Sequence, residues 1–237
     1  MKELRREVAL ACRVLAQAGL AADVLGHVSV RAPGGLLVRC RGPAESGLLF
    51  TTRDDIHLVG SDGRASLPDG YGVPGELPIH AETLRARPEV AAVVHAHPPA
   101  LVAADLAGLR LRPVVGAYNI PAARMARAGI PVYRRGVLIR RAALAQEMLA
   151  AMGTAPVCVL RGHGVTTTGS SVAEAVVRAL NIEALARVML AAAQAGGNPP
   201  DLPEADAAEL PDLGGRLNTE SVWRYHLARL DLAGLGI

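Results

Sequence analysis

Apolar side chains recur first at helical spacing and then at strand spacing along the N-terminal third of the chain. Between residues 4 and 15 they are three or four positions apart, which predicts an amphipathic helix that Gly19 ends. Residues 27–31 and 36–40 have the length and composition of short strands, and the Pro-Gly-Gly turn at 33–35 joins them. The chain is therefore predicted to begin with a helix and a β-hairpin.

The pattern alternates between strands and helices further along. Apolar runs at 48–51 and 56–59 continue the series of short strands, and residues 64–75, rich in glycine and proline, are expected to form a loop. Glu76 then opens a helix that must end before Arg87-Pro88, because the residue before a proline is pushed out of the helical region.

Two buried strands are predicted in the second half, at residues 90–94 and 157–160. The sequence from Ser171 to Glu174 has the form of a capping box for a long helix, which the glycines and prolines from Gly196 onward stop. A tail and a last short helix at about 200–237 complete the chain.

Strands interrupted by helices predict an α/β fold in which helices cover both faces of a mixed sheet. The 237 residues fit one domain, 1–237, because no linker is long enough to separate two. No apolar stretch is long enough for a membrane span, and the charged N-terminus is unlike a signal peptide. Three scattered cysteines argue against a disulfide framework, so we expect a cytoplasmic protein.

The charge distribution excludes a nucleic-acid partner despite a pI near 9.0. The net charge is only +3, the arginines are spread along the chain, and aromatic residues that could stack on bases are 3% of the total. Local arginines could still bind an anionic small molecule.

Histidines carry most of the chemical information. The chain has seven, and three of them follow predicted strands: His95 and His97 after one strand, and His163 between two glycines after another. Imidazole nitrogens are good ligands for borderline divalent metals, and three of them leave a coordination position open for substrate. Together with Glu76 upstream, they predict a catalytic metal site. The ion itself is not specified, since imidazole and carboxylate accept Zn, Mn, Co or Fe.

These motifs also resemble a known family. The segments 26–31, 76–80, 86–90, 93–97 and 161–164 are similar in order and spacing to the class II aldolase/adducin superfamily, over roughly residues 4–196. The resemblance implies a three-layer α/β/α sandwich with a central mixed sheet, usually as a cyclic tetramer with sites at subunit interfaces. It implies that His95, His97 and His163 bind the metal, and that Glu76 is the acid/base and an additional ligand before substrate arrives.

The departures from that family indicate which branch the chain resembles. Sugar-phosphate aldolases and epimerases typically have Gly-Asn where this chain has Gly26-His27, and two serines where it has Pro74-Gly75. Because proline lacks an N–H and neither residue has a hydroxyl, two phosphate contacts are missing. The chain instead resembles the decarboxylases of ortho-hydroxylated aromatic carboxylates, such as dihydroxyphthalate-type compounds.

Decarboxylation is therefore favoured over aldol cleavage or 4-epimerisation of a sugar phosphate, and both would need a metal that stabilises an enolate-like oxygen. A non-catalytic adducin-like interaction domain is a third alternative, which should have lost its metal ligands. The expected partner is a small anionic substrate. Side chains expected to contact it are His27, Ser29, Arg31, Thr52, Arg161 and, from the neighbouring subunit, Tyr225.

Overall fold

The computed structural model describes residues 1–60 and 62–237 and contains, within them, a sheet in the strand order β3-β2-β1-β4-β7-β6-β5. All neighbouring strands are antiparallel except the pair at one edge, β5 and β6, so the prediction of a mixed sheet is confirmed. The strands are β1 (His27–Ala32), β2 (Gly35–Arg39), β3 (Ile56–Val59), β4 (Ala92–Ala96), β5 (Val132–Tyr133), β6 (Val157–Leu160) and β7 (Gly164–Gly169).

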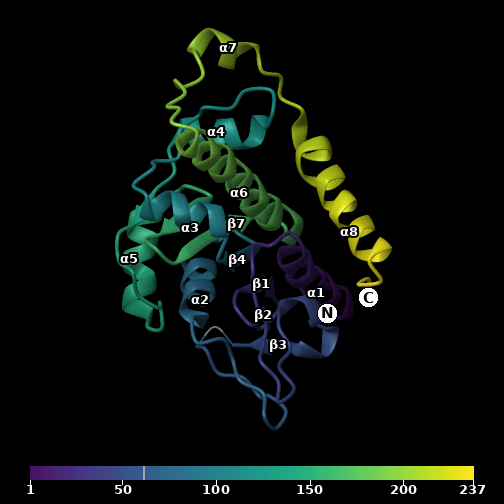
Figure 1. Cartoon of the computed structure of the whole chain (residues 1–237). Helices are drawn as coiled ribbons and strands as arrows, with labels where there is room; N and C mark the ends of the chain where they lie inside the picture. The colour runs from purple at the N-terminus through teal and green to yellow at the C-terminus, as the bar shows by residue number, and fades with distance from the viewer. Residues whose placement is uncertain (61) are drawn as a thin grey trace.

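Helices pack on both faces of this sheet, which confirms the predicted α/β/α layering (Figure 1). The larger layer consists of α1 (Lys2–Gln17), α3 (Pro99–Leu106), α4 (Ile120–Ala128), α6 (Val172–Gln194) and α8 (Val222–Leu232). The other face carries α2 (Leu77–Ala86) and α5 (Ala142–Met152). A short α7 (Glu204–Glu209) and a π-helical turn (Arg216–Ser221) lie between α6 and α8.

The alternation of side chains along the strands divides the core between the two faces. In β4, Ala92, Val94 and Ala96 point to the larger helical layer, whereas Val93 and His95 point to the side of α2. In β1, Val28 and Val30 belong to the first core, so His27 and Ser29 also face α2. Polar side chains from two adjacent strands are thereby gathered on the α2 face.

The register of β1 and β4 brings two histidines next to each other. His27 lies directly opposite His95 across this antiparallel pair, and Ser29 lies opposite Val93. On its other side β4 pairs with β7, so that His95 faces Thr166. The site-bearing end of β4 is therefore central in the sheet.

Most predicted elements are confirmed, with two corrections. The strand predicted at 90–94 is β4, Ala92–Ala96, so His95 lies within the strand rather than after it. The N-terminal helix, the β1–β2 hairpin, the strand at 56–59, the helix after Glu76 and the long helix after Ser171 are present. Residues 48–50, however, form a short 3-10 helix rather than a strand. Within the described residues, α3, α4, α5, β5 and β7 are elements that the sequence analysis does not predict.

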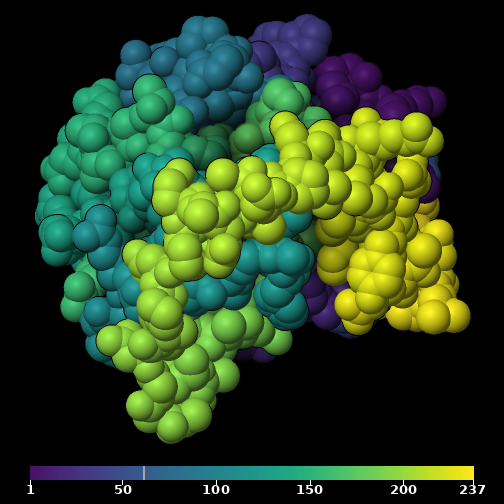
Figure 2. All heavy atoms as spheres, turned by 90° about the horizontal axis from the view of Figure 1, so that it is seen from above, coloured from purple at the N-terminus to yellow at the C-terminus, as the bar shows by residue number. Residues whose placement is uncertain are grey.

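The C-terminal segment lies on the surface of the larger helical layer. In Figure 2 it crosses the front of the molecule, over the segment around α4, and ends in α8. Figure 1 shows α8 running back towards the N-terminal end of the chain beside α1. Among the described residues, no helix combines the length and apolar character needed to cross a bilayer.

Candidate metal centre

Four predicted residues meet on the α2 face of the sheet. The side chains of Glu76, His95, His97 and His163 each offer one potential ligand atom, and these atoms all lie within 4.8 Å of one another. The Nε2 atoms of His95 and His97 are 2.9 Å apart, and a Glu76 carboxylate oxygen lies 3.4 Å from His95 Nε2 and 3.5 Å from His163 Nε2. Residues from three distant parts of the sequence thus form one cluster.

The local backbone explains how the histidines converge. His95 is in β4 and His97 follows the end of that strand, where Pro98 and Pro99 turn the chain into α3. His163 lies in the tight turn between β6 and β7, in which its N–H bonds to the Leu160 carbonyl. The end of β4 and the start of β7 are adjacent in the sheet, because Ala96 pairs with Val165. The loop after β4 and the turn before β7 therefore come together.

Glycines allow the second turn to approach the first. Gly162 has a φ of +58°, a left-handed conformation that other residues adopt at a cost. A Cβ atom on Gly164 would lie 2.2 Å from the Ala96 carbonyl oxygen and 2.8 Å from the His97 ring. Gly164 is therefore required by the close contact between the two histidine-bearing loops, and Gly162 by the backbone conformation of the turn.

Glu76 is at the N-terminal end of α2 but does not cap that helix with its side chain. Its carboxylate instead accepts a hydrogen bond of 2.7 Å from the backbone N–H of Ile139 and points to the histidines. Burial alone would raise the pKa of Glu76, but the neighbouring His163 and His95 and the Ile139 N–H together hold it well below its usual value. The group rests as a carboxylate.

Burial lowers the pKa of a histidine, whereas it raises the pKa of a carboxyl group. Desolvation lowers the pKa of His97 to about 3, with further lowering by His95 and His163, and it also lowers the pKa of His95. At neutral pH these imidazoles are uncharged and each keeps one nitrogen lone pair. His95 Nδ1 lies 3.2 Å from the carbonyl oxygen of Val165, which can only accept, so Nδ1 carries the proton and Nε2 keeps the lone pair.

The cluster fits a divalent metal on these observations. Both ring nitrogens of His163 are buried, and neither hydrogen-bonds to any residue that the structure describes. Buried polar atoms without partners are rare, and an ion is one of the groups that can satisfy them. A carbonyl that orients a histidine through Nδ1, as Val165 does for His95, is the usual outer partner of a metal-binding imidazole.

A second set of polar side chains lies directly behind the cluster. His27 Nδ1 is 2.6 Å from His80 Nε2, and His80 Nδ1 is 2.7 Å from the Ser29 hydroxyl. The His27 and His95 rings are 4.9 Å apart between centroids. Ser29 is fully buried and its hydroxyl lies next to His80, so the structure does not bring it into the cluster.

Arg31 is also engaged in the fold, and the structure does not bring it into the cluster. Its guanidinium donates hydrogen bonds to the backbone carbonyls of Leu84, Arg87 and Val90. It lies four residues along β1 from His27, about 13 Å away at the rise of an extended strand. Arg31 therefore stabilises the end of α2 and the loop after it.

Thr52 lies in a separate hollow that includes none of the four clustered residues. It caps a short 3-10 helix, Arg53–Asp55, and its hydroxyl is 2.9 Å from the Asp55 carboxylate. Tyr225 is 59% exposed on α8 and lines another such hollow, next to Tyr118. The structure does not bring either side chain into the cluster.

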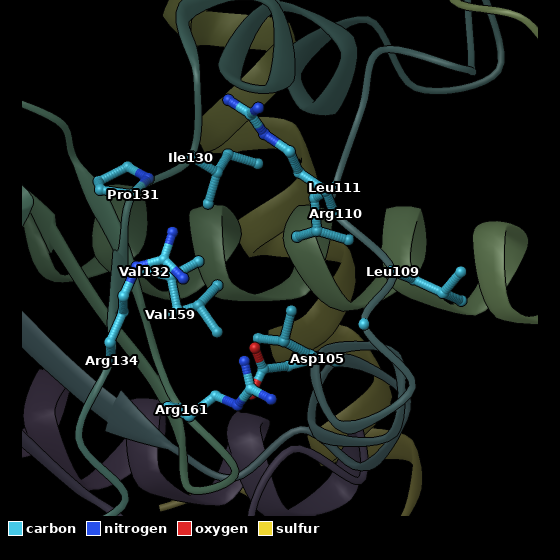
Figure 3. Close-up of a pocket in the computed structure, with 12 residues that line it drawn as sticks. Asp105, Leu109, Arg110, Leu111, Ile130, Pro131, Val132, Arg134, Val159 and Arg161 are labelled. Atoms are coloured by element: carbon cyan, nitrogen blue, oxygen red, sulfur yellow. The ribbon is translucent and has the colours of Figure 1, made fainter.

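Arg161 precedes the His163 turn but its side chain points elsewhere. Figure 3 shows it beside Asp105 in a pocket of about 370 Å³ that Val132 and Val159 also line. Val159 belongs to the core on the larger helical layer, so this pocket is on the opposite face of the sheet from Glu76. The structure therefore places the Arg161 side chain outside the cluster.

Three contacts at the site were not predicted: the Ile139 N–H, the Val165 carbonyl and the Asp105 carboxylate, which accepts a hydrogen bond from the Gly162 N–H. The first two are backbone groups, which no residue type reveals. Asp105 lies near the C-terminal end of the otherwise apolar helix α3, and no motif marks it.

The sequence is similar to a known family and to enzymes with assigned reactions. The sequence matches the family described as Class II Aldolase and Adducin N-terminal domain over residues 6–190. The 3,4-dihydroxyphthalate decarboxylase of Arthrobacter keyseri is 56% identical over 234 residues, which cover 97% of this chain and 94% of that protein. The enzyme of the same name from Rhodococcus jostii is 52% identical, over 94% of this chain and 93% of that protein.

Solved structures support the fold. An aldolase II superfamily protein from Pseudomonas syringae superposes with a TM-score of 0.81 at 22% identity, over 99% of this chain and 94% of that one. L-fuculose 1-phosphate aldolase from Glaciozyma antarctica superposes with a TM-score of 0.79 at 21% identity, over 97% of this chain and 90% of that one. This chain belongs to the class II aldolase/adducin family.

Proposed function

We propose that this protein is a divalent-metal-dependent decarboxylase of an ortho-hydroxylated aromatic carboxylate, with 3,4-dihydroxyphthalate as the first candidate substrate. The observation that carries the proposal is the identity of 52–56% with 3,4-dihydroxyphthalate decarboxylases over nearly the whole of each chain. The cluster of Glu76 and three histidines supports it, because a non-catalytic member of the family would have no reason to keep that set.

The residues proposed to hold the metal are His95, His97 and His163, with Glu76 as an additional ligand. A bound divalent cation would act as a Lewis acid that polarises the hydroxyl and carboxylate oxygens of the substrate. Neutral imidazoles leave the full charge of the ion available for this purpose. The candidate ions for this ligand set are Zn, Mn, Co and Fe.

Glu76 is proposed to move the proton. Because it rests as a carboxylate, it would first accept the proton of a substrate hydroxyl and then deliver it to the ring carbon that loses CO2. The electron pair of the broken carbon–carbon bond becomes the new carbon–hydrogen bond, and the phenolate oxygen regains a proton from water. The Ile139 N–H, 2.7 Å from the other carboxylate oxygen, fixes the orientation in which Glu76 works.

The test is direct. The purified protein, with Zn²⁺, Mn²⁺, Co²⁺ or Fe²⁺ supplied separately, is assayed for CO2 release from 3,4-dihydroxyphthalate and for aldol cleavage of fuculose and ribulose phosphates. We expect CO2 release with at least one ion and no cleavage of the sugar phosphates. Turnover of a sugar phosphate without CO2 release would assign the aldolase function instead, and absence of stoichiometric metal would favour a non-catalytic domain.

We also propose, from the family, a homotetramer that works in the cytoplasm. Light scattering after size exclusion should then give about four times the 24.6 kDa chain mass. The proposed role of Tyr225 in a neighbouring subunit's site depends on that assembly.

A further inference from the structure

Three buried side chains form a continuous hydrogen-bonded chain that ends at His27. Ser29 Oγ lies 2.7 Å from His80 Nδ1, and His80 Nε2 lies 2.6 Å from His27 Nδ1. Ser29 and His80 are 0% exposed and His27 is 5% exposed. The chain connects β1 with α2 and lies against the metal cluster without being part of it.

The direction of the hydrogen bonds follows from the chemistry of the groups. Within the described part of the chain, His80 Nδ1 is the hydrogen-bonding neighbour of the Ser29 hydroxyl. If Ser29 accepted from His80, its own hydrogen would be buried without an acceptor, which is unfavourable. Ser29 is therefore the donor. His80 then carries its proton on Nε2 and donates it to His27 Nδ1.

This order determines the state of His27. With Nδ1 occupied as an acceptor, the neutral His27 ring carries its proton on Nε2, the nitrogen turned away from His80. Among the described residues, the hydrogen-bond partner of the His27 ring is His80, which contacts Nδ1 and leaves Nε2 for another acceptor. The ring itself is next to His95, its partner across the β1–β4 pair. His27 thus presents a free N–H donor beside the site.

We propose that Ser29 and His80 are positioning residues that hold His27 as a neutral, Nε2-protonated donor to a carboxylate oxygen of the substrate. The assignment rests on the proposed function, since a carboxylate is an acceptor that needs such a donor. It gives a physical reason for histidine at a position where the sugar-phosphate branch typically has asparagine. It also assigns the recognition of one carboxylate group of a dicarboxylate substrate to His27.

The hydrogen-bonding state is measured independently of any reaction. Long-range ¹H–¹⁵N spectra of the ¹⁵N-histidine-labelled, Zn²⁺-loaded protein report which nitrogen of each ring carries the proton. We expect protonated Nε2 and unprotonated Nδ1 for both His27 and His80, and a shift of the His80 signals in Ser29→Ala. A His27 ring protonated at Nδ1 would overturn the proposal whether or not the protein is a decarboxylase.

The functional arm uses matched variants. His27→Phe, which removes the donor, should raise the KM for 3,4-dihydroxyphthalate at least tenfold, as expected on loss of a hydrogen bond to a charged group. His27→Gln, which retains an N–H donor, should recover most of that loss. Ser29→Ala should raise KM several-fold with a smaller change in kcat, and the exposed loop variant Ser66→Ala should change neither.

The outcomes separate the two proposals. Absence of CO2 release by the wild-type protein would contradict the proposed function without affecting the spectroscopic result. Release of CO2 with an unchanged KM in His27→Phe would overturn the role of His27 alone. Should His27→Phe not fold, Ser29→Ala still decides, because an unchanged KM together with unchanged His80 signals contradicts the chain of hydrogen bonds.

Discussion

The Asp105 carboxylate accepts a hydrogen bond of 2.7 Å from the backbone N–H of Gly162, the residue before His163. Asp105 is near the C-terminal end of α3, and α3 begins at Pro99, two residues after His97. At its N-terminal end, the buried Glu183 on α6 accepts hydrogen bonds from the Ala100 and Leu101 N–H groups. One short helix, fixed at both ends by carboxylates, therefore sets the spacing of two histidine-bearing loops.

This relationship predicts that Asp105 affects the metal without touching it. Asp105→Ala frees the Gly162 N–H and removes the partner of Arg161, which lies 3.7 Å away. Loss of an outer partner typically weakens metal binding by about 10- to 100-fold, and we expect the lower end for Zn²⁺ measured by chelator competition. The exposed Asp69→Ala is the matched control, and equal affinity for both variants would show that α3 does not position His163.

His97→Ala should remove the metal and the activity together. The Nε2 atom of His97 lies 2.9 Å from that of His95, and two imidazoles with one carboxylate hold a divalent ion far less well than the full set. Elemental analysis of the purified variant measures this. His226→Ala, in α8 and outside the cluster, should keep a full complement of metal. Retention of stoichiometric metal by His97→Ala would remove that residue from the proposed site.

Glu76→Gln separates proton transfer from binding. The amide keeps the size of the side chain and can still accept from the Ile139 N–H, but it cannot take up a proton. We expect kcat to fall by about 10²- to 10⁴-fold, the usual contribution of general acid–base catalysis, with a much smaller change in KM. Glu89→Gln, an exposed carboxylate paired with Arg87, is the control. A variant with normal kcat would assign proton transfer to another group.

The sequence predicts the ligand set better than the substrate contacts, for a physical reason. A metal site needs particular residue types at strand ends. His95, His97 and His163 are recognisable as such residues because glycines and prolines lie next to them. Substrate contacts depend on where a long side chain points. Arg31 and Arg161 have the right chemistry, but backbone carbonyls bind one and Asp105 attracts the other.

The unpredicted elements have a similar origin. The strand β7 reads Gly-Val-Thr-Thr-Thr-Gly, and its threonines give no alternation of apolar and polar positions. The strand is buried throughout and pairs with β4 on one side and β6 on the other. The Thr167 hydroxyl donates a hydrogen bond to the Ala175 carbonyl of α6. Such a strand is recognisable only once its neighbours are in place. Conversely, residues 48–50 are apolar enough for a strand but pack against α1 as a 3-10 turn.

Protonation of His80 should link stability to pH. Burial lowers the pKa of His80 to about 3, from an ordinary value of about 6.5 for an exposed histidine. Below pH 6.5 the unfolded chain takes up a proton that the folded chain refuses, so stability falls as the pH decreases through the window from 6.5 to about 3. Between pH 7.5 and 5 this group alone removes about 2 kcal/mol from the free energy of unfolding.

The measurement is urea unfolding at both pH values, with a chelator present so that metal release does not contribute. His80→Gln should lose less stability than the wild-type protein over the same interval, whatever its stability at pH 7.5. Parallel losses in the two proteins would mean that His80 is already protonated in the folded state.

The C-terminal helix α8 contributes to the core of the fold, so its removal should affect stability. Removal of the chain after about Gly215 would be harmless to folding if α8 only reached another subunit's site. Leu230, however, is fully buried in the core of the larger helical layer, and Arg13 donates a hydrogen bond of 2.8 Å to the Leu235 carbonyl. Truncation should therefore destabilise the whole domain.

A pair of leucines two positions apart tests this without shortening the chain. Leu230→Ala leaves a cavity in that core and should lower the free energy of unfolding by about 2–5 kcal/mol. Leu232 is 90% exposed on the same helix, so Leu232→Ala should change the stability by no more than about 0.5 kcal/mol. Urea denaturation of both variants at equal metal loading measures the difference. Equal stability would mean that α8 does not pack on α1 in solution, and that it is free to serve a neighbouring subunit instead.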